Sequence, residues 1–487
     1  MPADPRHRRR APLALLLPAV IAAGLVANPA WAQPGPNAWS DAVRRGTGLP
    51  APQPEHNAWP HVERASKLLQ AGLDSLRLPG PDGTPTRPIV RTTEFILPAS
   101  DEASAQLQSF IESSVRTLEA TEIPAAIDDA VKAAHCEQSS SDGWAAAITR
   151  SMSVVGPDAA LLDLANFEII RFTIASRAGD APAAEARLHS AARLAWCYEQ
   201  GPLARRLIGS VVLDSLALAL REEIMARRVA PDRAARYLKV LSDARPPTPW
   251  RLATNLERVQ LEGLAWGIAR QSGQMAEGFF ARAIEACALE EHPDVAEIVG
   301  RATRAENIDP TVRLVNAALD TYAPMSRAQR RAARGFIDLR SVGDLLPCDP
   351  YLVARSLTES WQWVEAWLEQ IDAHESRFQA TRVMLALEAA RAKPDAPYPD
   401  TLSTLVPSFL SALPVDPVSG APFAYKKMDD PTRDAFRRGY LLWSLGSDAD
   451  DDSGREPVTL ADLPRLLVHG LADPADGDWV VNTPNRP

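Results

Sequence analysis

Residues 158–178 read DAALLDLANFEIIRFTIASRA, and this stretch decides the fold class. Apolar side chains recur in it every three or four residues, at Leu161, Leu164, Phe167, Ile170 and Ile174. That spacing matches the turn of an α-helix, so the stretch predicts one helix with an apolar face. Gly179 and Asp180 follow directly and predict the end of this helix and the N-cap of the next one.

The same pattern extends in both directions and predicts a helical region over residues 100–394. Helices are expected at residues 104–120, up to residue 198, through 212–224, at 232–243, at 252–269, and from Asp349-Pro350 through residue 391. Short turns between such helices make them antiparallel neighbours. The sequence therefore predicts a mainly α fold, in which antiparallel helix pairs form a bundle or an irregular stack. No repeat period predicts a regular solenoid.

Residues 33–99 precede the helical region and contain many Pro and Gly residues. Such a composition is typical of linkers and turns, because proline removes a backbone donor and glycine adds backbone freedom. We expect a linker followed by an irregular segment here, with one short strand at residues 93–96.

Residues 1–32 carry the three parts of a secretory signal peptide. A basic cluster at residues 6–10 precedes an apolar run at residues 11–27, and Ala30-Trp31-Ala32 follows as a cleavage site. We therefore expect export to the periplasm or the extracellular space. An uncleaved anchor is the alternative, since the apolar run is at the short limit for crossing a bilayer. The apolar residues 207–220 contain Asp214, which predicts a buried helix rather than an integral membrane span.

The composition excludes some partners and leaves others open. The 46% hydrophobic content is that of a globular protein, and the net charge of −10 argues against nucleic acid, which needs a basic face. The four cysteines are Cys136, Cys197, Cys287 and Cys348, and their spacing predicts no zinc site. After export they could form up to two disulfides, or they could remain small buried apolar residues.

Residues 395–487 differ in character from the helical region. A turn-rich stretch ends the last long helix, and a short helix is expected at residues 401–405. Apolar and aromatic runs between turn residues predict short strands at 424–425, 440–443 and 479–481. We expect a small α+β module here.

This module resembles the C-terminal domain of a type II secretion major pseudopilin. The resemblance rests on Tyr398-Pro399, on residues 416–425 with the pattern Asp-Pro-x-x-Gly-x-Pro-x-x-Tyr, and on the Ser-x-Gly-x-Asp of residues 444–448. It implies a helix leading into a three-stranded sheet, with a calcium-binding loop. The N-terminus lacks the prepilin-peptidase site and assembly helix of a pseudopilin, so the resemblance implies a fold and not membership in a pilus.

The helical region resembles a group of uncharacterised exported helical proteins of environmental bacteria that end in the same kind of module. This resemblance rests on Cys136 with Trp144, on residues 191–195 and on residues 256–258. It implies no activity.

An acidic loop is the one candidate metal site in the sequence. Asp448, Asp450, Asp451 and Asp452 lie between two glycines, and Asp478 precedes the last expected strand. Clustered carboxylate oxygens on a loop suit calcium, which would pin the loop between strands. The loop does not match an EF-hand, because a serine replaces its turn glycine. The alternative is a solvated acidic loop.

No catalytic or cofactor-binding set is recognisable in the sequence. It contains no nucleophile elbow, no phosphate loop and no dinucleotide fingerprint, and His374-Glu375 lacks the second histidine of a zinc-protease helix. We therefore expect an exported, envelope-associated helical scaffold or interaction protein with a protein partner. The alternatives are a secreted hydrolase that uses dispersed Asp and Glu residues, and a calcium-dependent binding module.

Overall fold

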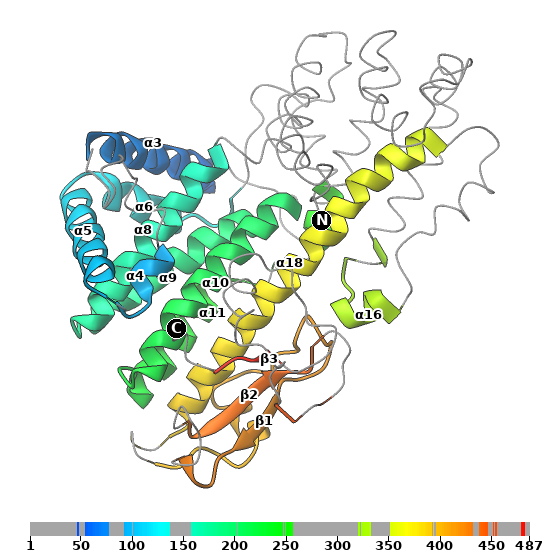
Figure 1. Ribbon diagram of the computed structural model, residues 1–487. Helices are drawn as coiled ribbons and strands as arrows, with labels where there is room; N and C mark the ends of the chain where they lie inside the picture. The colour runs from blue at the N-terminus through cyan, green and yellow to red at the C-terminus, as the bar shows by residue number, and fades with distance from the viewer. Residues whose placement is uncertain are drawn as a thin grey trace, which may run out of the picture.

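Figure 1 shows the computed structural model, which describes residues 46–47, 54–76, 92–99, 101–136, 157–201, 203–246, 248, 250–256, 320–321, 323–332, 351–391, 393, 396–431, 438–446, 451, 453–454 and 479–482. The expected signal peptide at residues 1–32 lies outside the described residues, and so does most of the acidic loop.

The described chain is mainly helical, which confirms the predicted fold class. Five helices form the centre of this body, namely α8 (Pro157–Arg177), α9 (Ala181–Glu199), α10 (Leu203–Met225), α11 (Pro231–Ala244) and α18 (Tyr351–Ala389). α9 packs against α8, α10 and α11, and α18 packs against α10 and α11. Figure 1 shows α18 beside α10 along much of its length. The helices share one apolar core.

The stretch 158–178 forms α8 as predicted, but its burial is not confined to one face. Residues 163–173 are buried without a break, because α3, α9, α10 and α5 surround the helix. At its end Gly179 has φ +77°, and the carboxylate of Asp180 accepts a hydrogen bond from the backbone N–H of Ala183 at 3.1 Å. This confirms the predicted helix end and the N-cap of α9.

The expectation of a linker and irregular segment over residues 33–99 is wrong for two parts of it. Residues Trp59–Ser75 form the 17-residue helix α3, which packs on α6 (Ile123–Val131) and α8. Trp59, Val62, Leu69 and Leu73 are buried at helical spacing, and Pro60 stands in the first turn, where a proline is tolerated.

The predicted strand at 93–96 is also wrong, because residues Thr92–Ile96 form the short helix α4. Phe95 and Ile96 are buried in the common core, and α5 (Glu102–Glu119) follows. Four β-favouring residues form a helical turn here because tertiary packing outweighs weak strand propensity.

α18 is 39 residues long and leads from the helical body into the C-terminal module. The 3-10 helix η4 (Leu402–Leu405) and the strands β1 (Ala424–Lys427), β2 (Tyr440–Ser444) and β3 (Trp479–Val480) follow, close to their predicted positions. The strands form one antiparallel sheet in the order β1-β2-β3, with Tyr425 opposite Leu442.

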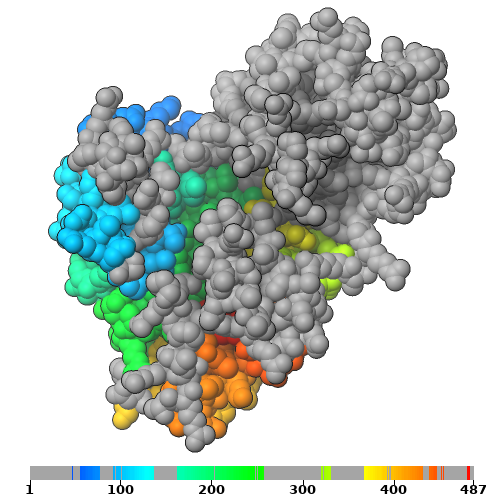
Figure 2. Space-filling model, in the orientation of Figure 1, coloured from blue at the N-terminus to red at the C-terminus, as the bar shows by residue number. Residues whose placement is uncertain are grey.

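The sheet packs beside the end of α18, and Leu442 and Val481 belong to the same core as the long helices. In the space-filling view the N-terminal helices and the C-terminal module lie at different ends of the visible face (Figure 2). The short helix α16 (Arg327–Ala332) contacts α18 beside the module. Among the described helices, none combines the length and apolarity needed to cross a membrane.

Candidate functional site

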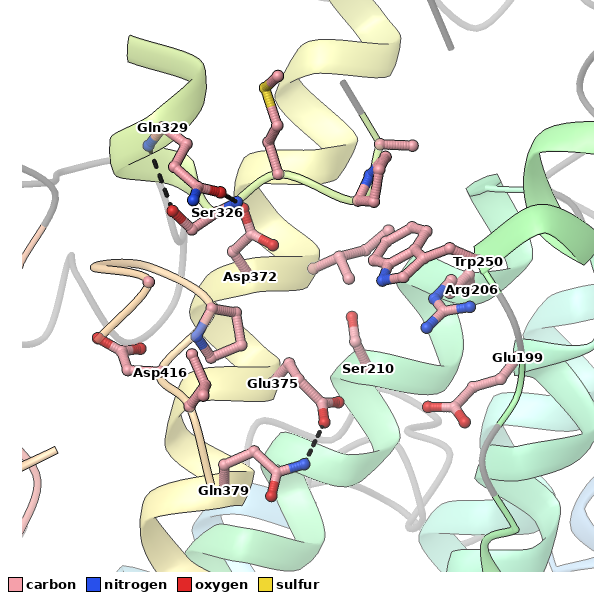
Figure 3. A pocket seen from close by; sticks show the side chains of 17 residues that line it. Glu199, Arg206, Ser210, Trp250, Ser326, Gln329, Asp372, Glu375, Gln379 and Asp416 are labelled. Atoms are coloured by element: carbon pink, nitrogen blue, oxygen red, sulfur yellow. Dashed lines mark hydrogen bonds between the residues drawn. The ribbon is translucent and has the colours of Figure 1, made fainter. Parts of the chain in front are cut away.

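A cavity of about 380 Å³ lies where the helical body meets the C-terminal module. Its walls come from α9 and α10, from residues 323–329, from α18, and from the loop at 415–420 (Figure 3). Its volume falls in the range of small-molecule sites. Carboxylates from three of these walls line it, namely Glu199, Asp372, Glu375 and Asp416.

Glu199 and Glu375 are joined by one arginine. Arg245 Nε donates to Glu199 Oε2 at 2.9 Å, and Arg245 Nη2 donates to Glu375 Oε2 at 2.8 Å. Burial of Glu375 opposes its ionisation, but the charge and hydrogen bonds of Arg245 outweigh it and hold the pKa of Glu375 below its ordinary value. Glu375 is therefore ionised at neutral pH, and both carboxylates are already paired with Arg245.

Arg206 lines the same cavity from α10, and the described residues give it no comparable partner. Its guanidinium carbon lies 3.8 Å from the centre of the Trp250 ring, a cation–π contact. Its Nη1 is buried and has no hydrogen-bond acceptor among the described residues. Burial lowers the pKa of Arg206 from its ordinary value, while the nearby charge of Glu199 works against this effect.

Asp372 and Asp416 complete the acidic walls. Arg330 Nη2 donates to Asp372 Oδ2, and both side chains are buried. Asp416 is fully buried and accepts from the backbone N–H groups of Val418 and Ser419, each at 3.1 Å. Asp416 therefore holds the turn that Gly420, with φ +76°, completes.

The two quoted motifs of the C-terminal module meet at Asp416. Ser444 Oγ donates to Asp416 Oδ2 at 2.5 Å and accepts from the backbone N–H of Gly446 at 3.1 Å. The turn also binds α16, because the carbonyl of Pro417 accepts from the backbone N–H of Arg327 at 3.0 Å. One carboxylate thus links the end of β2 to the loop that borders the cavity.

A second, partly buried ion pair joins α10 to α18 outside the cavity. Arg377 Nε donates to Asp214 Oδ1 at 2.6 Å, and His374 Nδ1 lies 3.0 Å from Asp214 Oδ2. Burial opposes ionisation of Asp214, but Arg377 and His374 outweigh it and hold the pKa of Asp214 well below its ordinary value. Asp214 therefore bridges two helices, as the prediction of a buried helix through it requires.

Of the predicted calcium ligands, only Asp451 is described. Its Oδ1 accepts from the Trp443 indole at 3.1 Å and from the backbone N–H of Ser453 at 2.8 Å. Asp448, Asp450, Asp452 and Asp478 lie outside the described residues. In the described part of the chain, no three His, Cys, Asp or Glu side chains come together as a metal site would require. The calcium site stays a prediction.

Sequence reasoning did not identify the cavity residues. Glu199, Arg206 and Glu375 come from three helices, and no local motif connects them. The available signal was a set of charged residues inside strongly apolar helical stretches, because a buried charge needs a partner from another element. That signal shows that partners exist without showing which ones they are.

Comparison of the chain with protein-family models, with curated proteins and with solved structures finds no match.

Proposed function

We propose that this protein is an exported, envelope-associated helical scaffold or interaction protein whose C-terminal module has a pseudopilin-like fold. The observation that carries the proposal is α18, a single 39-residue helix that packs on α10 and α11 and also contacts β2. A helix shared by the body and the module joins them through regular backbone rather than through a linker. Such an arrangement suits a rigid surface for a protein partner.

The pseudopilin-like fold of the module is supported by element order. A long helix, a turn at Tyr398-Pro399 and a three-stranded antiparallel sheet follow one another. Tyr425 Oη donates to the carbonyl of Pro399 at 2.6 Å, so the Tyr-Pro turn is tied to β1. Residues of both quoted motifs meet at Asp416.

A hydrolase at the cavity is disfavoured by the state of its carboxylates. A general acid that works near neutral pH needs a raised pKa, and the pKa of Glu375 is lowered instead. Glu199 and Asp372 are bound to arginines, and Asp416 is committed to donors of its own turn and of Ser444. Each carboxylate therefore has a structural role that accounts for it.

The test compares partner retention with turnover for the full mature chain. The tagged protein is incubated with detergent-solubilised envelope extract, and the retained proteins are identified beside those of a Lys427→Gln control. A partner that is retained reproducibly, with no hydrolysis of ester, peptide or glycoside substrates, supports the proposal. Turnover that disappears in the Glu375→Gln variant would establish the hydrolase in its place.

Calcium binding by the acidic loop is a separate proposal, supported by the quoted Ser-x-Gly-x-Asp pattern and by a loop that turns back on β2. Gly446, Ser453 and Gly454 have positive φ, and Asp451 contacts Trp443 of β2. Melting of the purified protein with calcium and with a chelator tests it. A higher Tm in calcium supports the site, and an unchanged Tm with no bound metal excludes it.

A further inference from the structure

The cavity at the junction is lined by a buried arginine, Arg206, that has a donor group without a hydrogen-bond acceptor among the described residues. Arg206 is only 9% exposed, and its Nη1 has no acceptor within the described part of the chain. Trp250 covers one face of the guanidinium and fixes its direction. A buried donor without an acceptor is unfavourable, so the site is suited to a ligand that brings an oxygen.

The charges around Arg206 limit what that ligand can be. The cavity is lined by the carboxylates of Glu199, Asp372, Glu375 and Asp416, and it receives the positive charges of Arg206, Arg245 and Arg330. Arg382 also interacts with Glu375, so the positive and negative charges around the cavity nearly balance. An anion would meet the carboxylates at close range, and a cation would meet Arg206.

A hydroxyl group of a ligand can meet both kinds of charged group in the cavity, because it accepts from a guanidinium and donates to a carboxylate. Side chains that can accept a hydrogen bond from a ligand hydroxyl are already in place, since Glu375 and Gln379 face the cavity beside Ser210 (Figure 3). The aromatic ring of Trp250 adds an apolar wall. We propose that the cavity at the junction binds an uncharged, hydroxyl-rich ligand of sugar-like chemistry, with Arg206 as its principal donor.

This inference rests on the proposed function, which it deepens by giving the interaction protein a ligand class. The probes are a panel of hexoses, N-acetylated amino sugars, disaccharides and inositol, measured by calorimetry and by thermal shift on the full mature chain. Citrate and glutamate serve as anions, and spermidine serves as a cation. We expect at least one hydroxyl-rich probe to bind and neither charged class to compete.

The variant Arg206→Met keeps the volume and removes the donor, so we expect it to weaken binding at least tenfold. Arg236→Met, on the exposed side of α11, is the matched control and should bind as the wild type does. If Arg206→Met does not fold, Gln329→Ala at the exposed edge of the cavity gives a second measure, with a loss of a few-fold expected.

Preferential binding of an anion, or binding by no probe of any class, would overturn the ligand assignment. These failures are distinct from failure of the proposed function. Retention of an envelope partner without sugar binding would leave the function standing, whereas hydrolysis of a bound glycoside would keep the ligand class and overturn the non-enzymatic role.

A second, independent observation concerns two cysteines. Arg193 and Cys197 of α9 and its C-cap residue Gln200 are separated by four and three positions, so they share the face that lies toward the segment after α6. Arg193 Nη2 donates to the carbonyl of Ala133, and Gln200 Oε1 accepts from the backbone N–H of Cys136 at 3.2 Å. Both bonds hold Cys136 beside Cys197.

The thiols of Cys136 and Cys197 are free and buried, and Cys197 is close enough to raise the pKa of Cys136. We propose that Cys136 and Cys197 form a disulfide when the chain is exported to an oxidising compartment. The oxidant is a protein or small-molecule disulfide. Two thiols lose two protons and two electrons, one sulfur–sulfur bond forms, and the oxidant's disulfide is reduced to two thiols.

The environment of the folded pair affects how fast this happens. The hydrogen bond with Cys197, followed by burial, raises the pKa of Cys136 well above its ordinary value. Since the thiolate is the reacting species, the folded, reduced pair is slow to oxidise.

Peptide mapping by mass spectrometry under non-reducing conditions tests the pairing on protein exported to the periplasm and on protein made in the cytoplasm. We expect a linked Cys136–Cys197 peptide in the exported protein only, and a lower Tm for Cys136→Ser than for wild type in that form alone. Free thiols at both positions after export, or linkage of either one to Cys287 or Cys348, would overturn the proposal.

Discussion

The helical body and the C-terminal module are each stabilised by a different kind of polar contact. Between α9, α10, α11 and α18, buried charges meet across helices, as Arg245 does with Glu199 and Glu375. Around Asp416 in the module, the donors are hydroxyls and backbone amides. Loss of one partner in the body leaves an uncompensated buried charge, which is more costly than an unmet neutral donor. Stability should therefore be more sensitive to single substitutions in the body.

The largest effect is expected from Arg245→Met. This change removes the arginine that neutralises two buried carboxylates, and breaking a buried ion pair on one side costs about 3–5 kcal/mol. Urea unfolding of the variant and wild type at pH 7 measures the difference.

The matched control for Arg245→Met replaces the whole ion network. The triple variant Arg245→Met, Glu199→Gln, Glu375→Gln removes all three charges of this network and leaves Arg206 as the remaining buried charge beside it, so a large part of the lost stability should return. A single variant that loses less than about 1 kcal/mol would show that water reaches these carboxylates, and would remove the contrast between the two regions.

The next effect is expected in the module, from Asp416→Ala. The change leaves the hydroxyls of Ser419 and Ser444 and two backbone N–H groups without their acceptor, at a cost of about 2–3 kcal/mol. Ser444→Ala removes only one of these donors and should cost less than half as much. Urea unfolding followed by circular dichroism measures both. A larger loss than that of Arg245→Met would reverse the comparison.

The third expected effect is a pH-dependent change in the free energy of unfolding, on the order of 2 kcal/mol, which arises in the helical body alone. The pKa of Asp214 is depressed by Arg377 and His374, so the unfolded chain binds its proton more readily than the folded chain does. Stability from this carboxylate is present above the ordinary pKa of 3.8 and is lost as the pH falls toward the folded value. Asp214→Asn should be less stable at pH 7 and should lose less stability on acidification.

Urea midpoints from pH 7 to pH 3 measure this slope. Glu168 serves as a control with the opposite pH dependence, because burial raises its pKa. The stability that Glu168 contributes therefore falls as the pH rises through its pKa in the folded chain. Equal slopes for wild type and Asp214→Asn would contradict the assignment of the acid sensitivity to this ion pair.

The fold was largely predictable and the cavity was not, for one physical reason. Helix α8, the Asp180 cap and the three strands follow from local spacing and turn chemistry. The Pro and Gly content of residues 33–99 predicts irregular chain, yet α3 forms there because its one proline stands in the first turn, where a helix tolerates it. The cavity joins Glu199, Arg206 and Glu375 across three helices, and such a meeting depends on packing that one sequence does not specify.

The smallest effect is expected from Lys427→Ala in β1. Lys427 Nζ lies 2.7 Å from Asp400 Oδ1, close to the 2.8 Å between Arg245 and Glu375, but the Asp400 side chain is 85% exposed. An exposed ion pair contributes about 0–1 kcal/mol, because water solvates both charges after separation. Asp400→Asn removes the same charge contact without altering the strand and serves as the control in urea unfolding. The two distances are alike, so the difference between the two losses reflects burial together with the larger number of hydrogen bonds that Arg245 makes. A loss of unfolding free energy above about 1.5 kcal/mol in both variants would mean that ion pairs stabilise the module as well. The body and the module would then not differ in the kind of polar contact that stabilises them.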